Sequence, residues 1–310
     1  MNGSNTAGVL VVGSANRDYV STLDRLPRPG ETVLGADLTV SSGGKGANQA
    51  VAAATYGARC ALVACVGDDA DGRALVASLV ASKVEVNEVA TVGDVRTGAA
   101  FVLVTRGGEN SIVVAPGANS RLRPGVAAAA VERLASSFGV VVAQAEIPVD
   151  TLAAALRAAD AHGVRAVLNL APFVELPAEV VALADPLVVN ETEAGALLGR
   201  DVDGVTGALE AAASLVARAR SVVVTLGPQG AVVVAARNVD HVAAYPVDVV
   251  DSTGAGDAFT GVLAAALSFG DDLLGAVRCG VAAGTIAVGH RGAQASLEHR
   301  GDVAGTSRSG

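Results

Sequence analysis

Asp251-Ser-Thr-Gly-Ala-Gly-Asp257 is followed at once by an apolar segment, 258–267, and is preceded by 246–250, which has the composition of a strand. The order predicts a strand, a Gly-rich turn and a helix. Backbone N–H groups at such a turn converge in front of the positive end of the helix dipole, so the site favours an anion, most commonly phosphate. Asp257 is electrostatically misplaced there unless it accepts a proton from a hydroxyl that attacks the phosphate. A helix start with a capping Asp explains the stretch equally well.

Length and composition narrow the class of protein. The chain has 310 residues, of which 51% are apolar and 3% aromatic, so Ala, Val and Leu must build a large core. The net charge of −9 argues against nonspecific nucleic-acid binding. No run of about 18 apolar residues predicts a membrane span, and the first residues resemble no secretory signal. Cys60, Cys65 and Cys279 lack metal-ligand spacing, so we expect buried, reduced thiols and a cytoplasmic location.

A second Gly-rich helix start, Ser41-Ser-Gly-Gly-Lys-Gly-Ala-Asn48, carries a cation and a carboxamide. It is not a Walker A loop, because position 39 is Thr and Gly46 follows the lysine where that loop needs Ser or Thr. The glycines indicate close approach of the backbone to a ligand. Lys45 and Asn48 are therefore candidates to bind hydroxyl or phosphate groups of that ligand.

From residue 60 onward, apolar strands alternate with helices, and polar residues follow the strand ends. Repeated strand–helix units predict an α/β fold with a mainly parallel central sheet flanked by helices on both faces. The carboxyl ends of its strands share one edge, where such sheets bind ligands. That edge would hold Asn16, Asp18, Glu146, Asn190 and Glu193, although the last two could instead form a helix cap.

Two β-rich patches interrupt this alternation. We expect a small β-sheet lid built from about 17–42 and 97–115, including a hairpin of 98–105 with 111–114. A lid over a cleft would exclude water from a phosphoryl transfer, whereas an ordinary edge extension is the plainer alternative. We predict one α/β domain over residues 1–296, lid included, and a flexible tail over 297–310.

The chain resembles the PfkB sugar-kinase family, and within it the members that phosphorylate ribose. The resemblance is collinear from about residue 8 to 296. It is carried by Gly43-Gly-Lys-Gly-Ala-Asn-Gln-Ala50, Asn190-Glu-Thr-Glu193, Thr225-Leu-Gly227 and Asp251-Ser-Thr-Gly-Ala-Gly-Asp257, supported by Gly13-Ser-Ala-Asn-Arg-Asp18, Gly117-Ala-Asn119 and Gly292-Ala-Gln294.

The resemblance implies ATP-dependent transfer of the γ-phosphoryl group to the 5-hydroxyl of D-ribose, giving ribose 5-phosphate. Asp257 would be the base, and Thr253, Gly254, Ala255 and Gly256 would form the anion hole. The implied sugar-binding residues are Asn16, Asp18, Gly43, Gly44, Lys45, Asn48, Glu146 and Asp257.

The resemblance also implies a nucleotide site and two cations. ATP would bind with Mg²⁺, near which Glu193 would act indirectly, and a monovalent cation, K⁺, would bind beside the anion loop partly through backbone oxygens. The implied nucleotide-binding residues are Asn190, Glu193, Thr225, Gly227, Gly230 and Gly256. The implied K⁺ residues are Asp251, Thr253, Ala287, His290 (through its carbonyl), Gly292 and Ser296.

Several alternatives stay open. The lid region offers Tyr19 and Phe101 as its aromatic residues, which favours a small sugar over a nucleoside such as adenosine. Fructose and 2-deoxyribose remain alternatives, as does a catalytically inactive sugar-binding or regulatory protein. The segment 279–285 offers no Asn or His to face adenine, and Pro228-Gln229 stands where the family pattern suggests a basic residue. An NAD oxidoreductase is disfavoured because no GxGxxG follows a strand. We expect a homodimer formed through the exposed face of the lid.

Overall fold

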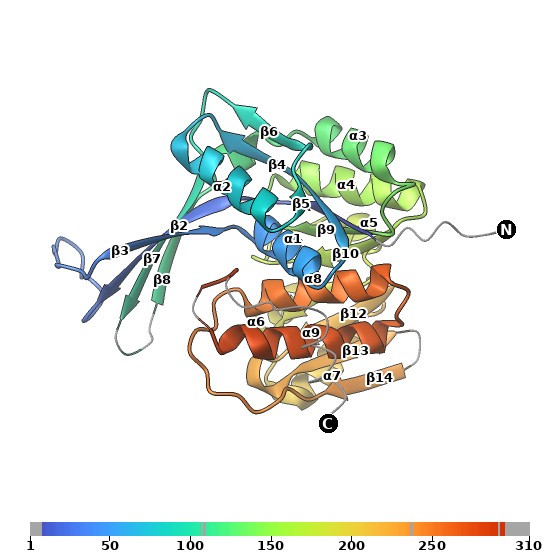
Figure 1. Cartoon of the computed structure of the whole chain (residues 1–310). Coiled ribbons are helices and arrows are strands. Elements are labelled where there is room, and N and C mark those ends of the chain that lie inside the picture. The colour runs from blue at the N-terminus through green and yellow to red at the C-terminus, as the bar shows by residue number, and fades with distance from the viewer. Residues whose placement is uncertain (1–7, 106, 108–109, 236–237, 291, 295–310) are drawn as a thin grey trace.

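Two β-sheets organise the chain. The computed structural model, shown in Figure 1, describes residues 8–294 apart from 106, 108, 109, 236, 237 and 291. Within these residues the larger sheet has ten strands in the order β14-β13-β12-β11-β10-β9-β1-β4-β5, with β6 paired to β4. The smaller sheet has four strands in the order β3-β2-β7-β8.

The centre of the larger sheet is parallel, as predicted. Its strands are runs of Val, Ala and Leu buried almost throughout, which is typical of parallel strands covered on both faces. The parallel strands are β1 (Gly8–Val12), β4 (Arg59–Gly67), β9 (Val140–Gln144), β10 (Arg165–Asn169), β11 (Leu187–Asn190) and β12 (Ser221–Thr225), with the short β5 (Val84–Glu85) and β6 (Val89–Val92). At the other edge β13 (Ala231–Ala235) and β14 (Asn238–Val242) run antiparallel.

Helices cover both faces of this sheet. Because successive residues of a strand face opposite sides, Leu10 and Val12 belong to one hydrophobic cluster, and Val9 and Val11 to the other. The first cluster packs against α3 (Pro124–Leu134), α4 (Val149–Ala161), α5 (Ala178–Val181), α6 (Glu191–Leu198) and α7 (Gly204–Leu215). The second packs against α1 (Lys45–Thr55), α2 (Ala70–Ala81), α8 (Ala255–Ser268) and α9 (Leu273–Val288). The predicted α/β architecture is therefore confirmed.

Helices α1 and α8 approach each other closely because Gly261 lacks a side chain. A Cβ at that position would lie 2.4 Å from the carbonyl oxygen of Gln49 and 2.6 Å from Cβ of Ala52. Both helices begin at a Gly-rich turn, at Gly44 and Gly254 respectively. Their close packing therefore brings the two Gly-rich helix starts of the sequence together.

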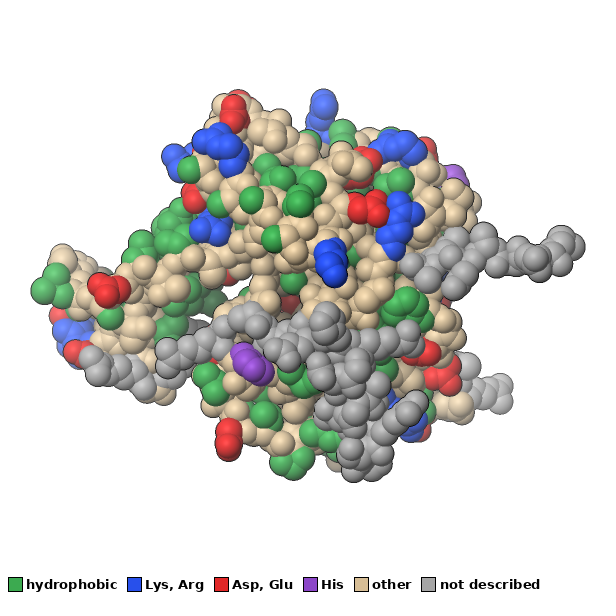
Figure 2. Space-filling view, viewed as in Figure 1, with side chains coloured by type: hydrophobic (Ala, Val, Ile, Leu, Met, Phe, Trp, Pro, Cys, Tyr) green, Lys and Arg blue, Asp and Glu red, His purple; other side chains and the backbone are tan. Residues whose placement is uncertain are grey.

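The small sheet projects from the main body (Figure 1) and consists of β2 (Asn16–Leu23), β3 (Leu38–Gly43), β7 (Gly98–Thr105) and β8 (Asn110–Ala115). The expected hairpin of 98–105 with 111–114 is formed by the antiparallel pair β7 and β8. Figure 2 shows the molecular surface hollowed between this sheet and the body. Large apolar side chains of the sheet are exposed, namely Leu38, Val40, Phe101, Ile112 and Val113.

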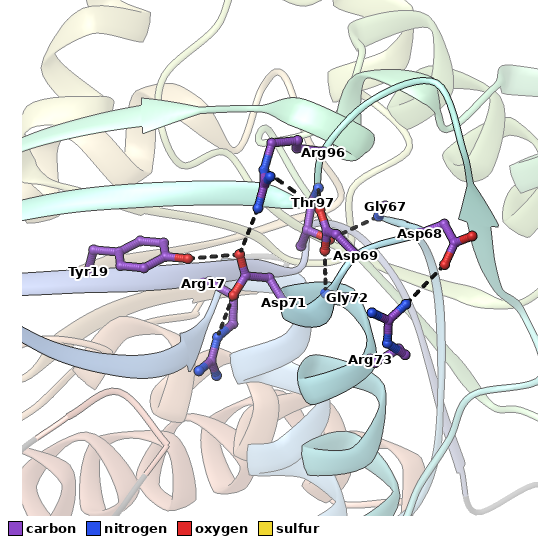
Figure 3. Close-up of polar contacts among 10 residues, drawn as sticks. All are labelled: Arg17, Tyr19, Gly67, Asp68, Asp69, Asp71, Gly72, Arg73, Arg96 and Thr97. Atoms are coloured by element: carbon purple, nitrogen blue, oxygen red, sulfur yellow. Dashed lines mark hydrogen bonds and ion pairs between the residues drawn. The ribbon is translucent and has the colours of Figure 1, made fainter.

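Two aspartates at the start of α2 hold the root of the small sheet (Figure 3). Asp69 caps the helix and accepts hydrogen bonds from the backbone N–H (2.9 Å) and the hydroxyl (2.7 Å) of Thr97, directly before β7. Asp71 accepts one from the Tyr19 hydroxyl at 2.8 Å and lies 3.7 Å from Nε of Arg17, both on β2. The first turn of α2 therefore fixes two strands of the lid where they leave the body.

Some local expectations were wrong. Residues 246–250 form no strand, because no strand among the described residues pairs with their backbone. Val247, Val249 and Val250 are exposed, and the N–H of Val250 bonds to the carbonyl of Val288 at 2.7 Å. Cys60 and Cys65 are buried and free, as expected, but Cys279 is only partly buried. The predicted boundary after residue 296 and the tail 297–310 lie outside the described residues.

Candidate active site

The turn 251–254 presents backbone N–H groups at the start of α8. Gly254 is the N-cap, with φ of 79°, and a Cβ there would lie 2.6 Å from Cα of Ala293. Asp251 shapes the turn, since its carboxylate accepts hydrogen bonds from the N–H of Thr253 (2.9 Å) and of Gly292 (3.0 Å). Within the described residues no side chain caps this helix. Of its first N–H groups, that of Ala255 bonds to the carbonyl of Ser252 at 3.3 Å, and those of Gly254 and Gly256 stand at the helix start, where they can bind an anion.

Asp257 lies in the first turn of α8 and is only 7% exposed. Two amides of α1 hold it: Nδ2 of Asn48 donates to its Oδ2, and Nε2 of Gln49 donates to its Oδ1, both at 2.9 Å. The Asp257 carboxylate is the largest influence raising the pKa of Lys45, against the opposing effect of burial. A carboxylate beside an anion-binding helix start, with a cation facing it, is an arrangement that can accept a proton from a bound hydroxyl.

A second acidic side chain, Asp18, enters from β2. Burial raises its pKa to about 6, and the negative charges of Glu146 and Asp257 add to the effect. Its carboxylate lies against the backbone of Gly43, where a Cβ would come within 2.0 Å of Oδ2. Gly44 has φ of 89°, and a Cβ there would lie 2.7 Å from the backbone nitrogen of Asn16. Both glycines are therefore required for β2 and the start of α1 to lie so close to each other.

Glu146 and Asn16 are held partly by Ser14 and Asn119, two residues that were not among the predicted site residues. Glu146 accepts hydrogen bonds from the Ser14 hydroxyl (2.6 Å) and the backbone N–H of Lys45 (3.1 Å). Asn119 donates to Oδ1 of Asn16 at 2.7 Å and accepts from the N–H of Ala15 at 2.9 Å. Ser14 stands two residues after the end of β1, so the expectation of ligand-binding polar residues just past a strand end, which singled out Asn16 and Asp18, applies to Ser14 as well. Nothing local identified the role of Asn119.

Asn190 and Glu193 form the capping box that the sequence left open as an alternative. Oδ1 of Asn190 accepts from the N–H of Glu193, and Oε2 of Glu193 accepts from the N–H of Asn190, both at 2.8 Å. Burial raises the pKa of Glu193, and the charge of Lys45 opposes this. The capping role therefore does not remove Glu193 from the electrostatic influence of the Lys45 ammonium.

The remaining nucleotide-site candidates lie on the neighbouring strand and its turn. Thr225 ends β12 and pairs in register with Asn190 of β11. Gly227 and Gly230 have φ of 52° and 90°. A Cβ at Gly230 would come within 2.0 Å of the carbonyl of Val242, so this glycine permits the tight turn into β13. Gly227 and Thr225 share the sheet edge with Asn190 and lie apart from the Asp18 group.

Five of the six predicted K⁺ residues are described, and they lie on the turn 251–254 and at or just after the end of α9. The N–H groups of Val250 and Asp251 bond to the carbonyl of Val288, which joins the turn 251–254 to Ala287 and His290. The His290 imidazole contacts the carbonyl of Ile286 through Nδ1 at 3.1 Å. The described residues contain no group of three or more His, Cys, Asp or Glu side chains placed to hold a metal. Ser296 lies outside the described residues.

Comparison with known proteins identifies the class of this fold. Residues 6–300 match the family model of the pfkB family carbohydrate kinases. A ribokinase of Haemophilus influenzae is 36% identical over 291 residues, 94% of this chain and 95% of its own. A deoxyribokinase of Salmonella typhi is 33% identical over 290 residues, 93% and 94% of the two chains. The structure of an Arabidopsis thaliana ribokinase complexed with ribose and ATP superposes with a TM-score of 0.87 at 29% identity, covering 98% of this chain and 99% of that one. Among the described residues no helix is long and apolar enough to cross a membrane.

Proposed function

Because the chain belongs to the pfkB family of carbohydrate kinases, we propose that it transfers the γ-phosphoryl group of ATP to the 5-hydroxyl of D-ribose, giving ribose 5-phosphate and ADP. The observation that carries the proposal is Asp257, buried at the anion-binding start of α8 and held by Asn48 and Gln49. Similarity to ribokinases over most of the chain supports ribose as the acceptor.

In the proposed mechanism the oxygen of the sugar 5-hydroxyl attacks the γ-phosphorus, and the bond from that phosphorus to the β–γ bridging oxygen breaks. The hydroxyl proton passes to the Asp257 carboxylate. Negative charge that develops on the transferring group is stabilised by the N–H groups of Gly254, Ala255 and Gly256 and by the Lys45 ammonium. No covalent intermediate is needed, because positioning and charge stabilisation supply the catalysis.

The sugar would bind among side chains that include both hydrogen-bond acceptors and hydrogen-bond donors. Asp18 and Glu146 supply acceptors, and Asn16, Lys45 and Asn48 supply donors. Tyr19 and Phe101 stack on each other at 5.6 Å, and the Tyr19 hydroxyl bonds to α2. Because Tyr19 and Asp18 are adjacent on β2, their side chains face opposite sides of the lid, so this aromatic pair lies away from the sugar. That placement supports a small sugar over a nucleoside.

ATP would bind with Mg²⁺ at the edge formed by Asn190, Glu193, Thr225, Gly227 and Gly230. A single buried carboxylate such as Glu193 fits Mg²⁺, which keeps several waters and is bound mainly through substrate phosphates. Mg²⁺ supplies charge neutralisation on the β- and γ-phosphates when bound.

A monovalent cation such as K⁺ would bind at Asp251, Thr253, Ala287, His290 and Gly292, on the turn 251–254 and at the end of α9, with Ser296, outside the described residues, as a further proposed ligand. The local chemistry supports this: the turn holds one carboxylate, Asp251, which accepts hydrogen bonds from the N–H groups of Thr253 and Gly292, and backbone carbonyls of the turn and of the end of α9 would supply the other oxygen donors. A site of oxygen donors with so little negative charge suits a monovalent cation better than a divalent one. When bound, the cation supplies positive charge beside the anion loop.

The lid is also the proposed dimer interface. Leu38, Val40, Phe101 and Val113 lie in register on one face of the small sheet, which is the Tyr19 face, and all four are exposed. An exposed apolar sheet face of this kind marks an interaction surface. Light scattering at micromolar concentration tests the dimer, and a monomeric mass would count against it. The cytoplasmic location and a single domain over residues 1–296 stay predictions.

The test of function is ADP production with Mg·ATP and K⁺ across ribose, 2-deoxyribose, fructose, adenosine and no sugar. Ribose-dependent turnover that falls when K⁺ is replaced by a large organic cation supports the acceptor and the cation site. Turnover with 2-deoxyribose alone, or with adenosine alone, would support the phosphotransferase activity but would show that ribose is not the acceptor. Folded protein that consumes no ATP with any acceptor would favour a sugar-binding protein without catalytic activity.

A further inference from the structure

We propose that Gln49 is a positioning residue for the reaction, and that Gln144 and Asn169 fix its amide in the orientation that holds Asp257. The inference rests on the proposed function, since it assigns a role to the neighbours of the proposed base. Gln49 is fully buried and lies in the second turn of α1. Its Nε2 donates both to Oδ1 of Asp257 and to Oδ1 of Asn169, each at 2.9 Å.

The charge on Asp257 determines how every amide in this group is oriented. An ionised carboxylate accepts hydrogen bonds and cannot donate them, so Gln49 must turn its NH₂ toward Asp257. Its Oε1 then faces away and requires a donor, which Nε2 of Gln144 supplies at 2.7 Å. Asn169 must present its oxygen to Gln49, and its own NH₂ turns to the carbonyl of Val188 at 3.3 Å. A flip of Gln49 would place oxygen against oxygen at both Asp257 and Asn169.

The group is anchored in the central parallel sheet. Gln144 and Asn169 are the last residues of β9 and β10, and they pair in register across the parallel sheet. Both are buried, and Oε1 of Gln144 packs against Gly13, where a Cβ would come within 2.0 Å. The base is therefore linked through one side chain to the edge of the central sheet, although it belongs to a helix that starts at a Gly-rich turn.

The amides of Asn48 and Gln49 fix the Asp257 carboxylate and still leave it lone pairs that can accept a proton. Asn48 occupies one lone pair of Oδ2 and Gln49 one lone pair of Oδ1, so the carboxylate cannot rotate without losing a hydrogen bond. Asn48 is supported from a different direction, since its Oδ1 accepts from Nε2 of Gln294 at 2.9 Å. The remaining lone pairs are the ones available for the proton of the sugar hydroxyl. Gln49 thus defines the direction from which the Asp257 carboxylate accepts the proton of the sugar hydroxyl.

The experiment compares the full-length wild type with Gln49→Met, which keeps the length and burial of the side chain and removes its hydrogen bonds. Loss of a charge-assisted hydrogen bond to the base is expected to lower kcat roughly tenfold to a hundredfold. KM for ribose and for ATP should stay within about threefold of wild type, since neither substrate contacts Gln49. Gln144→Met keeps the Gln49–Asp257 bond and removes its support, so its kcat should fall by less.

Thr151→Val is the matched control, because Thr151 is fully buried and its hydroxyl bonds to the carbonyl of Leu122 on the other face of the sheet. Thr151→Val should lose about as much thermal stability as Gln49→Met and keep the kcat of the wild type. Wild-type kcat in Gln49→Met overturns the inference, as does a loss of kcat accompanied by an equal rise in both KM values. A wild type without sugar-dependent turnover would overturn the proposed function instead. In that case crystal structures of the wild type and of Gln49→Met still test whether Gln49 positions Asp257. An Asp257 rotamer that is unchanged in Gln49→Met would overturn the positioning role.

Discussion

Replacement of Asp71 by Ala is expected to weaken sugar binding although Asp71 lies outside the site. Its carboxylate accepts from the Tyr19 hydroxyl at 2.8 Å and lies 3.7 Å from Nε of Arg17 (Figure 3). Arg17 and Tyr19 flank Asp18 on β2, so the contacts on one face of the strand set the direction of the Asp18 side chain on the other. Without Asp71, ribose must order the root of the lid when it binds.

The size of the expected rise in KM for ribose follows from these contacts of Asp71. A hydrogen bond to a charged group contributes about 1.5–3 kcal/mol when buried, and partial exposure of Tyr19 reduces this. The ion pair with Arg17 adds about 0–1 kcal/mol, and Arg96, 3.7 Å from Asp71 but 81% exposed, adds nothing measurable. A total of about 1–2 kcal/mol corresponds to a rise of roughly 5- to 30-fold in KM for ribose.

The assay is ADP production at saturating ATP with ribose varied, and then at saturating ribose with ATP varied. KM for ATP and kcat should change by less than about twofold, because the nucleotide edge lies far from the lid root. Asp68→Ala is the matched control: Asp68 precedes the same helix and pairs with Arg73 at 3.1 Å, with both side chains more than two-thirds exposed. The reasoning is refuted if KM for ribose is unchanged in Asp71→Ala, or if Asp68→Ala raises it equally.

Asp257→Asn should lower kcat by about 10²–10⁴ with the protein folded by circular dichroism, because the proposed base is removed; near-normal turnover would contradict its role. Since the pKa of Asp18 is raised to about 6, the folded protein binds more protons than the unfolded chain between about pH 4 and 6. The free energy of unfolding should therefore fall as pH rises through that window, by less than about 3 kcal/mol, and urea titrations should find this fall missing in Asp18→Asn. Gly44→Ala should lose more than about 1 kcal/mol of stability and most sugar-dependent turnover, since φ of 89° and a Cβ 2.7 Å from the backbone nitrogen of Asn16 both oppose it; a wild-type melting temperature would argue otherwise.

Much of the fold could be predicted because its signals are local. Apolar runs such as those of β1 and β9, each followed by polar residues, indicated buried parallel strands with a functional edge. The Gly-rich starts of α1 and α8 were recognisable because φ above zero at Gly44 and Gly254 suits glycine alone. The segment 246–250 misled for the same reason: its local preference for a strand was real, but a strand needs a neighbour that the chain does not place there.

The candidate site was only partly predictable. Asp18, Asn48, Glu146 and Asp257 could be proposed from the sequence because each follows a strand end or belongs to a Gly-rich turn. The residues that orient them were missed, since neither the link from Asn119 to Asn16 nor that from Ser14 to Glu146 has a signature in its own segment. The roles of the predicted residues stay predictions until the variants above are measured.

The sequence by itself determined which segments favour a strand, which helix starts are Gly-rich and which side chains are ionisable, since these properties depend on a few consecutive residues. The tertiary structure alone decided which of those groups meet. Gln49 and Asp257 are separated by 208 positions and become hydrogen-bonded because Gly261 lets α8 approach α1. Arg17 and Asp71 meet because α2 begins beside the root of the lid. Such contacts arise from packing between distant segments, which no local pattern encodes.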